Sequence, residues 1–406
     1  MKESDMLKGL LRKNDTRIVY LVMDGVGGIR NRDFPNTALE SAKTPNLDAI
    51  ASESACGRIT PISTGITPGS GPAHFSLFGY DPLLPENNAG RGVIEVTGVG
   101  FELKDTDVAI RGNFATIDDN GVLTDRRAGR IPHEEGIRIC EKLSAKIKKI
   151  DDIEIIIMPV REYRFGIVLR GEGLSPLIEE TDPQVTGKQP LAPTATAPQG
   201  ERTASILTRL VKMIDGILAD EDKAKTVLLR GISQKPSIES FGERYGIKAA
   251  AVAAYPLYRG VAKLCGMDLF DTGFTPVEEF ETVKSIYNGD YDLFFIHIKK
   301  TDSYGEDGNI EGKIRVIEEV DAAIPLLLGL DPDVLIVTGD HSTPCAVKGH
   351  SWHPVPFMIR SRFCGIDASA GFNESECDKG SLGIFPAVSI MELALANAEK
   401  LKKYGA

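Results

Sequence analysis

The feature that most constrains this chain is an apolar run that ends in an acid and a histidine. Residues 334–338 are Val, Leu, Ile, Val and Thr, and after one glycine the chain continues with Asp340 and His341. Continuous aliphatic character predicts a strand covered on both faces, as in a parallel sheet. Ligands in open α/β folds bind at the carboxyl ends of such strands. The segment therefore predicts an α/β fold with chemistry at one sheet edge.

Two other segments repeat this pattern. Residues 17–23 form an apolar strand before Asp24, and residues 293–296 run into His297, with Asp302 on the following loop. If the three strands are parallel neighbours, their terminal acids and histidines converge on one edge of the sheet. Carboxylates and imidazoles are ligands for divalent metals, so we predict a metal site there.

The histidines favour the same edge. Three of the six histidines, His341, His350 and His353, lie between positions 341 and 353. Taken singly, each candidate ligand has a structural alternative: Asp340 as a helix cap, His341 as a hydrogen-bonded histidine, and His297 as a core histidine. His350 and His353 would each more often be structural than ligating. The clustering behind one strand is what favours metal binding.

Ser70 is the candidate nucleophile. It lies in residues 67–72, Thr-Pro-Gly-Ser-Gly-Pro, just before a predicted helix. The flanking glycines allow a metal and a phosphoryl group to approach, and the helix start offers N–H groups and a positive dipole. A hydroxyl beside a divalent metal can attack phosphate esters. The alternative is a serine that caps the helix.

Composition limits the partners and the location. The 406 residues include 47 Lys+Arg and 58 Asp+Glu, a formal charge of -11, which disfavours a broad nucleic-acid or anionic-membrane surface. No apolar run is long enough to span a bilayer, and the start lacks the apolar core of a secretory signal. We expect a cytoplasmic protein that acts on a small molecule.

The cysteines suggest no zinc ribbon or redox motif. None of the six forms a CxxC pair, so buried thiols are expected. Cys345 is the exception to watch, because it follows His341 by four residues.

The middle of the chain predicts a separate α+β domain. The expected elements are a hairpin around 119–121, a helix over 133–150, strands at 153–160 and 163–170, a Pro-rich connection over 183–198, a helix over 202–218 and a strand at 226–230. We therefore predict a core of residues 1–98 and 247–406 with an insertion of residues 99–246. Within the core, Thr44 before Pro45 predicts a helix start.

Several blocks together point to one family. They are Asp24-Gly25 and residues 43–48, 67–74, 339–345 and 350–356, with further matches at 126–130, 162–165, 169–175 and 253–257. This set resembles the alkaline phosphatase superfamily and, more narrowly, the archaeal-type cofactor-independent phosphoglycerate mutases. The resemblance extends along nearly the whole chain. It implies an alkaline-phosphatase-like α/β fold, with a mostly parallel sheet between helices and a smaller inserted α+β lid domain.

The resemblance also implies an activity, the interconversion of 3-phosphoglycerate and 2-phosphoglycerate in glycolysis and gluconeogenesis. Ser70 would receive the phosphoryl group as a phosphoserine, and the 2-hydroxyl of glycerate would recover it. Two divalent metals are implied, manganese first and magnesium, cobalt or zinc as alternatives, with no need for 2,3-bisphosphoglycerate. The implied ligands are Asp24, Ser70, Asp340 and His341 for one ion and Asp302, Glu306 and His350 for the other.

Basic residues are implied to hold the substrate carboxylate and phosphate, since arginine binds both anions through two N–H groups. They are His74, Arg126, Arg130, Arg164, Arg170, Arg230 and Arg259. A solvated surface role stays open for each arginine.

Two positions depart from the family pattern, which carries histidine at both. Glu306 still offers oxygen ligands and would favour manganese or magnesium over zinc. His297, His353 or Asp307 are alternative ligands in its place. Gln184 is the second departure, and it would alter turnover or specificity if it contacts the substrate.

The insertion is the expected lid, with hinges near residues 98–100 and 246. A mutase must exclude water so that glycerate, not water, takes the phosphoryl group. Two alternatives stay open: a metal-dependent phosphatase or mutase for another small phosphorylated substrate, and an inactive binding protein with the same fold. Oligomeric state is not predicted.

Overall fold

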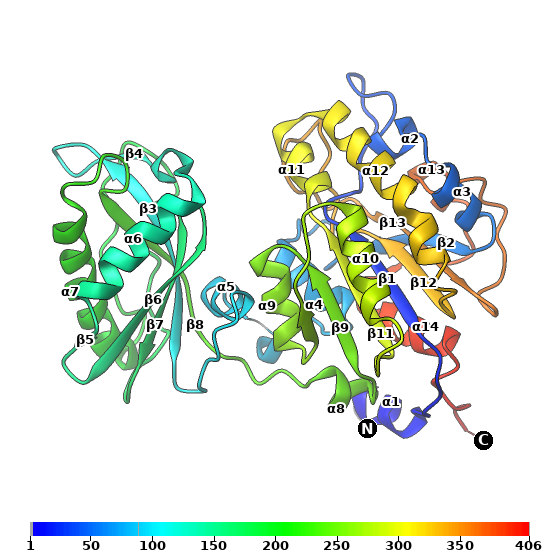
Figure 1. Cartoon of the computed structure of the whole chain (residues 1–406), viewed down its shortest axis with the longest axis horizontal. Helices are drawn as coiled ribbons and strands as arrows, with labels where there is room; N and C mark the ends of the chain where they lie inside the picture. Colours follow the sequence, from blue (N-terminus) through cyan, green and yellow to red (C-terminus); the bar gives the residue numbers. More distant parts are fainter. Residues whose placement is uncertain (1–2, 88, 406) are drawn as a thin grey trace. The chain divides into compact units, whose positions relative to one another are not determined.

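The computed structural model describes residues 3–87 and 89–405. The chain forms two compact units (Figure 1). We call Met1–Asn88 with Ile238–Ala406 the core unit, and Ala89–Ser237 the inserted unit.

The core unit is built on an eight-stranded sheet in the order β10-β9-β11-β1-β12-β13-β2-β14. Its strands are β1 (Ile18–Met23), β2 (Ala55–Thr60), β9 (Ala249–Ala253), β10 (Asp268–Phe270), β11 (Leu293–Ile298), β12 (Val334–Thr338), β13 (Val355–Ser361) and β14 (Gly383–Pro386). The five strands from β10 to β12 are parallel, and β13 runs antiparallel to both of its neighbours. The mostly parallel α/β sheet predicted from the apolar runs is confirmed.

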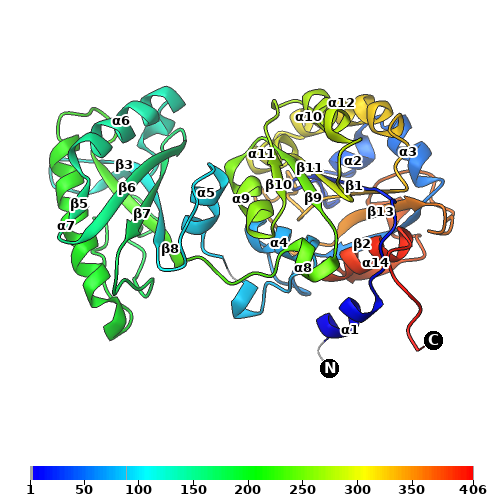
Figure 2. The same cartoon turned by 60° about the horizontal axis from the view of Figure 1, so that its bottom comes forward.

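Helices cover both faces of this sheet (Figure 2). The helices of the core unit are α1 (Glu3–Leu10), α2 (Ala38–Ser41), α3 (Pro45–Ala51), α4 (Ser70–Leu77), α8 (Phe241–Tyr245), α9 (Pro256–Leu264), α10 (Pro276–Ile286), α11 (Lys300–Asp307), α12 (Ile310–Leu328), α13 (Glu374–Cys377) and α14 (Ile390–Asn397), with the 3₁₀ turns η1 (Pro85–Asn87) and η4 (Ala387–Ser389). Helices α3, α10 and α12 lie on one face, and α4, α9 and α14 lie on the other. This double cover explains why β1, β11 and β12 are buried along their whole length.

The inserted unit is an antiparallel α+β fold with its own core. Its strands are β3 (Val108–Ile117), β4 (Leu123–Asp125), β5 (Lys149–Ile150), β6 (Ile153–Arg161), β7 (Arg164–Arg170) and β8 (Thr226–Gln234), and its helices are α5 (Arg91–Gly98), η2 (Ala128–Arg130), α6 (His133–Lys146), η3 (Pro198–Gly200) and α7 (Glu201–Leu218). Strands β4-β3-β7-β6-β5 form the sheet, and β8 pairs with β3. Side chains from the sheet, α6 and α7 form one apolar cluster.

The units change earlier in the chain than the sequence predicted. Helix α5 was assigned to the core, but it packs on β3 and β8, where a Cβ on Gly92 would lie 2.5 Å from the Ala109 carbonyl oxygen. Helix α8 was assigned to the insertion, but it contacts α1 of the core unit. These contacts between segments distant in sequence set the boundaries at Asn88/Ala89 and Ser237/Ile238.

Local signals predicted most element starts. The helix expected at Thr44-Pro45 is α3, although Thr44 makes no capping hydrogen bond with its side chain. The helix expected over 133–150 ends at Lys146, because the chain turns there into the short strand β5. No helix within the described ranges is both long and apolar enough to cross a membrane.

Candidate metal centre

The site lies at the carboxyl ends of three neighbouring parallel strands. Val22 of β1 pairs with His297 of β11 and with Thr338 of β12, so the three strands end at the same level. Asp24 follows β1 directly, and α11 begins immediately after β11. The convergence of acids and histidines predicted from the apolar runs is present.

The first potential ligand group consists of Asp24, Asp340 and His341, all fully buried. The Nε2 atom of His341 lies 3.4 Å from Asp24 Oδ1 and 3.2 Å from Asp340 Oδ2. Ser70 Oγ lies 3.3 Å from the same nitrogen. Ser70 opens α4, whose N-cap is Gly69, and no serine side chain caps this helix. The serine is therefore turned to the ligand group and does not act as a cap.

Two oxygens of this group lack a hydrogen-bond partner. They are Asp24 Oδ1 and Asp340 Oδ2, and both are buried. An unpaired buried carboxylate oxygen is costly unless a cation satisfies it. The donor set of two carboxylates, one imidazole and one hydroxyl therefore fits a divalent ion.

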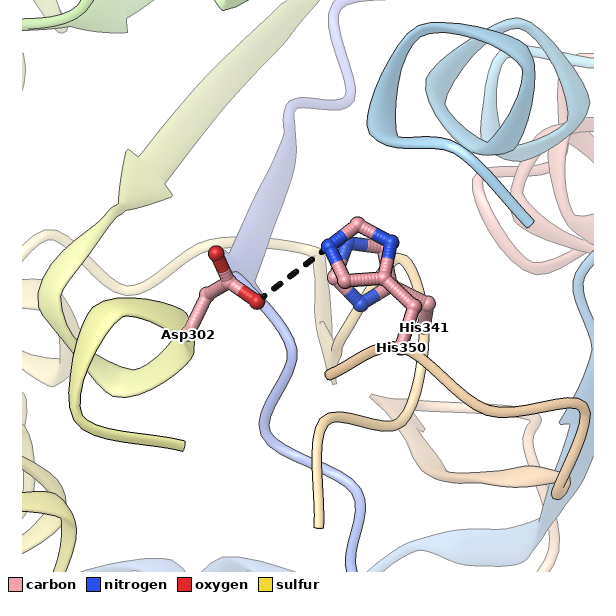
Figure 3. Close-up of side chains that lie close together, drawn as sticks. All are labelled: Asp302, His341 and His350. Carbon is pink, nitrogen blue, oxygen red and sulfur yellow. Dashed lines mark ion pairs between the residues drawn. The ribbon is translucent and has the colours of Figure 1, made fainter. Parts of the chain in front are cut away.

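The second potential group consists of Asp302, His341 and His350 (Figure 3). His350 Nε2 lies 3.6 Å from Asp302 Oδ1, and its Nδ1 lies 2.8 Å from the carbonyl oxygen of Pro68. The imidazoles of His341 and His350 stack with their centroids 3.7 Å apart. Because the Pro68 contact engages Nδ1, Nε2 of His350 is the nitrogen left to face a metal.

Burial and charge set the protonation of the group. Burial lowers the pKa of His341 well below its usual value, so the imidazole is neutral and able to ligate. Burial and the Asp24 carboxylate raise the pKa of Asp340 well above the usual range. Burial also opposes ionisation of Asp24, but Lys299 and His297 outweigh it and lower the pKa of this carboxyl. A cation between Asp24 and Asp340 would allow both to ionise.

Lys299 is a site residue that the sequence reasoning missed. Its Nζ lies 2.9 Å from Asp24 Oδ2 and 2.6 Å from Asp302 Oδ2, so one ammonium bridges an acid from each potential ligand group. Burial lowers the pKa of Lys299, but the Asp24 charge outweighs this and raises it well above the usual value. The available signal was its position between His297 and Asp302.

A layer of aromatic side chains lies beneath the acids. His297 Nε2 is 3.4 Å from Asp24 Oδ2, and its ring stacks on Tyr258 at 3.5 Å. The Tyr258 hydroxyl donates a hydrogen bond to the same Asp24 oxygen. His74 is also fully buried, with Nδ1 2.8 Å from the Ser70 carbonyl oxygen and 3.4 Å from Asp340 Oδ2. His74 therefore contacts Ser70 and Asp340 and has no exposed surface with which to bind a substrate.

The inserted unit brings some of the candidate arginines together. Arg126 contacts both oxygens of Asp182, at 2.8 and 2.7 Å, and Arg230 Nη1 lies 3.3 Å from the same carboxylate. Arg130 is exposed, and Arg164 is half-buried with an unpartnered Nε. Arg111, which the sequence reasoning overlooked, is buried with Nη1 3.3 Å from Glu95.

Two other arginines are engaged elsewhere. Arg170 lies at the opposite end of β7 from Arg164 and forms a two-point ion pair with Asp107, at 2.9 and 2.7 Å. Arg259 belongs to the core unit, where it binds Asp271 at 2.9 Å and the Phe270 carbonyl oxygen at 3.1 Å. Arg170 is thus separated from the group around Asp182.

Known proteins with similar sequences share one description. A family model described as 2,3-bisphosphoglycerate-independent phosphoglycerate mutase matches residues 51–223. A probable enzyme of that name from Aquifex aeolicus is 51% identical over 410 residues, covering 99% of this chain and 100% of the relative. One from Thermotoga maritima is 48% identical, covering 100% and 99%. The chain belongs to the 2,3-bisphosphoglycerate-independent phosphoglycerate mutase family.

Solved structures agree with the family. A protein from Pyrococcus horikoshii superposes with a TM-score of 0.81 at 28% identity, covering 96% of this chain and 99% of that one. The cofactor-independent phosphoglycerate mutase from Thermoplasma acidophilum superposes with a TM-score of 0.68 at 29% identity, covering 94% and 100%. The resemblance stated from the sequence motifs is confirmed.

The two departures from the family pattern have definite places. The side chain of Glu306 is 56% exposed, with Oε1 3.9 Å from His350 Nε2, at the rim of the second potential group. Asp307 is exposed on the same helix, and His353 contacts Ser351 at 3.0 Å. Gln184 has a φ of 61° and donates its backbone N–H to Asp182 at 2.8 Å, beside Arg126.

Cys345 is buried, and burial raises the pKa of its thiol. Cys345 belongs to neither of the two potential ligand groups. The six cysteines are free thiols, and all but Cys364 are buried.

Proposed function

We propose that this protein interconverts 3-phosphoglycerate and 2-phosphoglycerate without 2,3-bisphosphoglycerate, with Ser70 as the nucleophile. One observation carries the proposal: Ser70 Oγ lies 3.3 Å from His341 Nε2, beside two buried carboxylate oxygens that lack partners. Membership of the mutase family supports the substrate. A glycolytic substrate also supports a location in the cytoplasm.

The residues at the sheet edge would hold two divalent ions. Their proposed ligands are Asp24, Ser70, Asp340 and His341 for one ion and Asp302, Glu306 and His350 for the other. Two bound divalent ions would neutralise the phosphoryl oxygens and lower the pKa of the attacking hydroxyl. The sets are rich in oxygen, which favours Mn²⁺ or Mg²⁺ over Zn²⁺.

The chain's own residues prepare Ser70 for attack. Ser70 is the first residue of α4, so it lies at the positive end of the helix dipole. In the first half-reaction, a bond forms between Ser70 Oγ and phosphorus while the bond from phosphorus to the 3-oxygen of glycerate breaks; Ser70 loses a proton and the 3-oxygen gains one. In the second, the 2-hydroxyl of glycerate attacks phosphorus and loses its proton, the bond from phosphorus to Ser70 Oγ breaks, and Ser70 gains a proton.

The inserted unit would hold the glycerate and exclude water. Arg126 and Arg230 both contact Asp182, and Arg230 also pairs with Glu180, so two guanidinium groups lie together where we propose that a substrate anion binds. Arg164 and Arg130 are further candidates for contact with the substrate carboxylate or phosphate. Water must be kept away while glycerate turns, because it would release phosphate from the phosphoserine. We assign this lid role to Ala89–Ser237 in place of the residues 99–246 expected from sequence.

The test is turnover of 3-phosphoglycerate with Mn²⁺ and without 2,3-bisphosphoglycerate, followed by ³¹P NMR for 2-phosphoglycerate and free phosphate. The parent protein should form mainly 2-phosphoglycerate, and mass spectrometry of quenched samples should find phosphate on Ser70. Ser70→Ala should lose both products, by a factor of about 10⁴ or more, as expected when a nucleophile is removed.

Ser76→Ala is the matched control, since Ser76 lies on the same helix and is equally buried. It should keep parent activity. Substantial turnover in Ser70→Ala would end the assignment of Ser70 as the nucleophile.

A further inference from the structure

Lys313 is a buried lysine, and the hydrogen bonds that its ammonium group donates all go to backbone carbonyl oxygens. It lies in the first turn of α12 and is 1% exposed. Its Nζ donates to the carbonyl oxygens of Gly25, Thr343 and Gly27, at 2.7, 2.9 and 3.3 Å. The ammonium thus occupies a cage of three carbonyl oxygens. Carbonyl oxygens arranged around one point are how proteins coordinate monovalent cations such as K⁺.

This placement is energetically unfavourable for an ordinary side chain. Burial lowers the pKa of Lys313, and the first turn of a helix is the positive end of its dipole. An apolar side chain of similar length would avoid both costs. The charge of Lys313 is therefore stabilised by the three carbonyl groups that its ammonium contacts.

The carbonyl groups belong to the two loops that carry the first potential ligand group. Gly25 and Gly27 follow Asp24 by one and three residues, and Thr343 follows His341 by two residues. The Thr343 N–H donates to the Gly25 and Gly27 carbonyl oxygens, at 3.2 and 3.1 Å. These two carbonyl oxygens and that of Thr343 converge on the ammonium. Without a cation, the three aligned dipoles would repel one another in a buried space.

The same loops reach the second potential ligand group through one side chain. Thr343 Oγ1 donates to Asp302 Oδ1 at 2.7 Å and lies 3.0 Å from His341 Nδ1. The Gly25 N–H donates to Asp340 Oδ1 at 2.9 Å. The loops also meet closely: Gly25 has a φ of 58°, and a Cβ there would lie 2.4 Å from Thr343 Oγ1. A small movement of either loop would therefore displace ligands of both groups.

We propose that the Lys313 ammonium is a built-in monovalent cation, a positioning group that holds the loops after β1 and β12 together and so sets the spacing of the metal ligands. The proposal rests on the proposed metal site. Lys313 touches neither the substrate nor the reacting atoms in this scheme, and it acts through Gly25, Gly27 and Thr343.

The test uses Lys313→Ala with n-propylammonium, which replaces the three carbons and the nitrogen that the substitution removes. In sodium buffer, the variant should bind Mn²⁺ about 10–100-fold more weakly, the range seen when groups that orient metal ligands are lost. The metal-free variant should also unfold at a lower temperature than the parent. Propylammonium should restore both properties, whereas tetramethylammonium, which has no N–H, should restore neither.

Two further variants separate positioning from general stability. Lys313→Met has similar length without charge, so it should bind Mn²⁺ weakly and not respond to propylammonium. Lys400→Ala removes a lysine that is 2% exposed and bonds Asn14 O at 3.0 Å and Asp292 Oδ1 at 2.7 Å, before β1 and β11 begin. It should lose stability and keep parent affinity for Mn²⁺.

Several results would overturn the proposal: parent affinity in Lys313→Met, an equal loss of affinity in Lys400→Ala, or no effect of propylammonium on Lys313→Ala. If Lys313→Ala does not fold alone, refolding on adding propylammonium supports the cage, and failure to refold counts against it. If the parent binds no Mn²⁺, the proposed metal site fails, and the cage is decided by propylammonium's effect on metal-free unfolding.

Discussion

At the scale of single residues, the sheet edge is a balance of buried charges. Asp24 is held ionised by Lys299 and His297 against its burial, while Asp340 is driven towards its protonated form. Because these two acids come from separate segments, the sequence around either one does not predict the net charge of the pair. The candidate ligands nevertheless follow from the residue types at the strand ends. Lys299 and Lys313 do not follow, because Lys299 also contacts Asp24 and Lys313 contacts Gly25, both far away in the sequence.

Glu306 is the residue whose role can be tested most directly. Its carboxylate lies at the rim of the second potential group, 3.9 Å from His350. Glu306→Ala should weaken one of two Mn²⁺ binding events by about tenfold or more, as expected when an oxygen ligand is lost, and Glu306→His should raise the preference for Zn²⁺. Isothermal titration with each metal measures both changes. Asp307→Ala, on the same helix, should bind as the parent; a loss there would make Asp307 the ligand instead.

Glu279 on α10 should make stability depend on pH. Burial, together with the neighbouring Glu278 charge, raises the pKa of Glu279 well above the usual 4.5. The folded protein then keeps a proton that the unfolded chain releases, so this residue destabilises the fold as pH rises above about 4.5. Glu279→Gln should therefore gain stability relative to the parent at pH 8 but not at pH 4.5.

Urea unfolding of Glu279→Gln and the parent at both pH values measures this difference. Glu281→Gln, an exposed change on the same helix, should show no such trend. A constant difference between Glu279→Gln and the parent would contradict the prediction.

At the scale of elements, two helices that begin with the same pair of residues are capped by different contacts. Thr44-Pro45 and Thr275-Pro276 both place threonine before proline at a helix start. Only Thr275 forms a capping box, in which its hydroxyl accepts from the Glu278 N–H at 3.3 Å. Thr44 instead donates to the Asp48 side chain at 3.3 Å. The Thr-Pro pair occurs at the start of both helices, of which only the one at Thr44-Pro45 was predicted, and it does not distinguish how each helix is capped.

Thr275→Val should therefore destabilise the protein by about 1 kcal/mol, the usual cost of losing a cap. Thr44→Val, with the same change of shape, should cost less, because no orphan backbone N–H loses its partner. Thermal and urea unfolding of both variants give the comparison. Equal losses of stability in the two variants would contradict a stabilising contribution from the capping box of α10.

At the scale of the whole molecule, the chain forms two compact units, and the inserted unit interrupts the sequence of the core unit. The buried apolar cluster of the inserted unit lies entirely within residues 108–229. Such a self-contained core predicts independent folding. The boundaries were not evident from composition, because α5 and α8 were assigned by sequence proximity while their packing partners lie far along the chain.

Residues 89–237 expressed alone should therefore unfold cooperatively, as measured by circular dichroism during heating. The core unit with a short linker in place of these residues should still bind Mn²⁺ and, if the lid proposal holds, release free phosphate instead of forming 2-phosphoglycerate. An excised unit without cooperative unfolding would contradict the first expectation. A core that isomerises 3-phosphoglycerate without the insertion would contradict the second.

The sequence alone determined the parallel sheet, the convergence of the candidate ligands at the ends of β1, β11 and β12, and the family. Those features depend on local periodicity and on residue types at strand ends, which persist wherever the strands are placed. Tertiary structure decided which charges meet: Lys299 between two acids, Lys313 in its carbonyl cage, and Arg170 bound to Asp107. A buried charge is defined by neighbours from distant segments, and only folding chooses them.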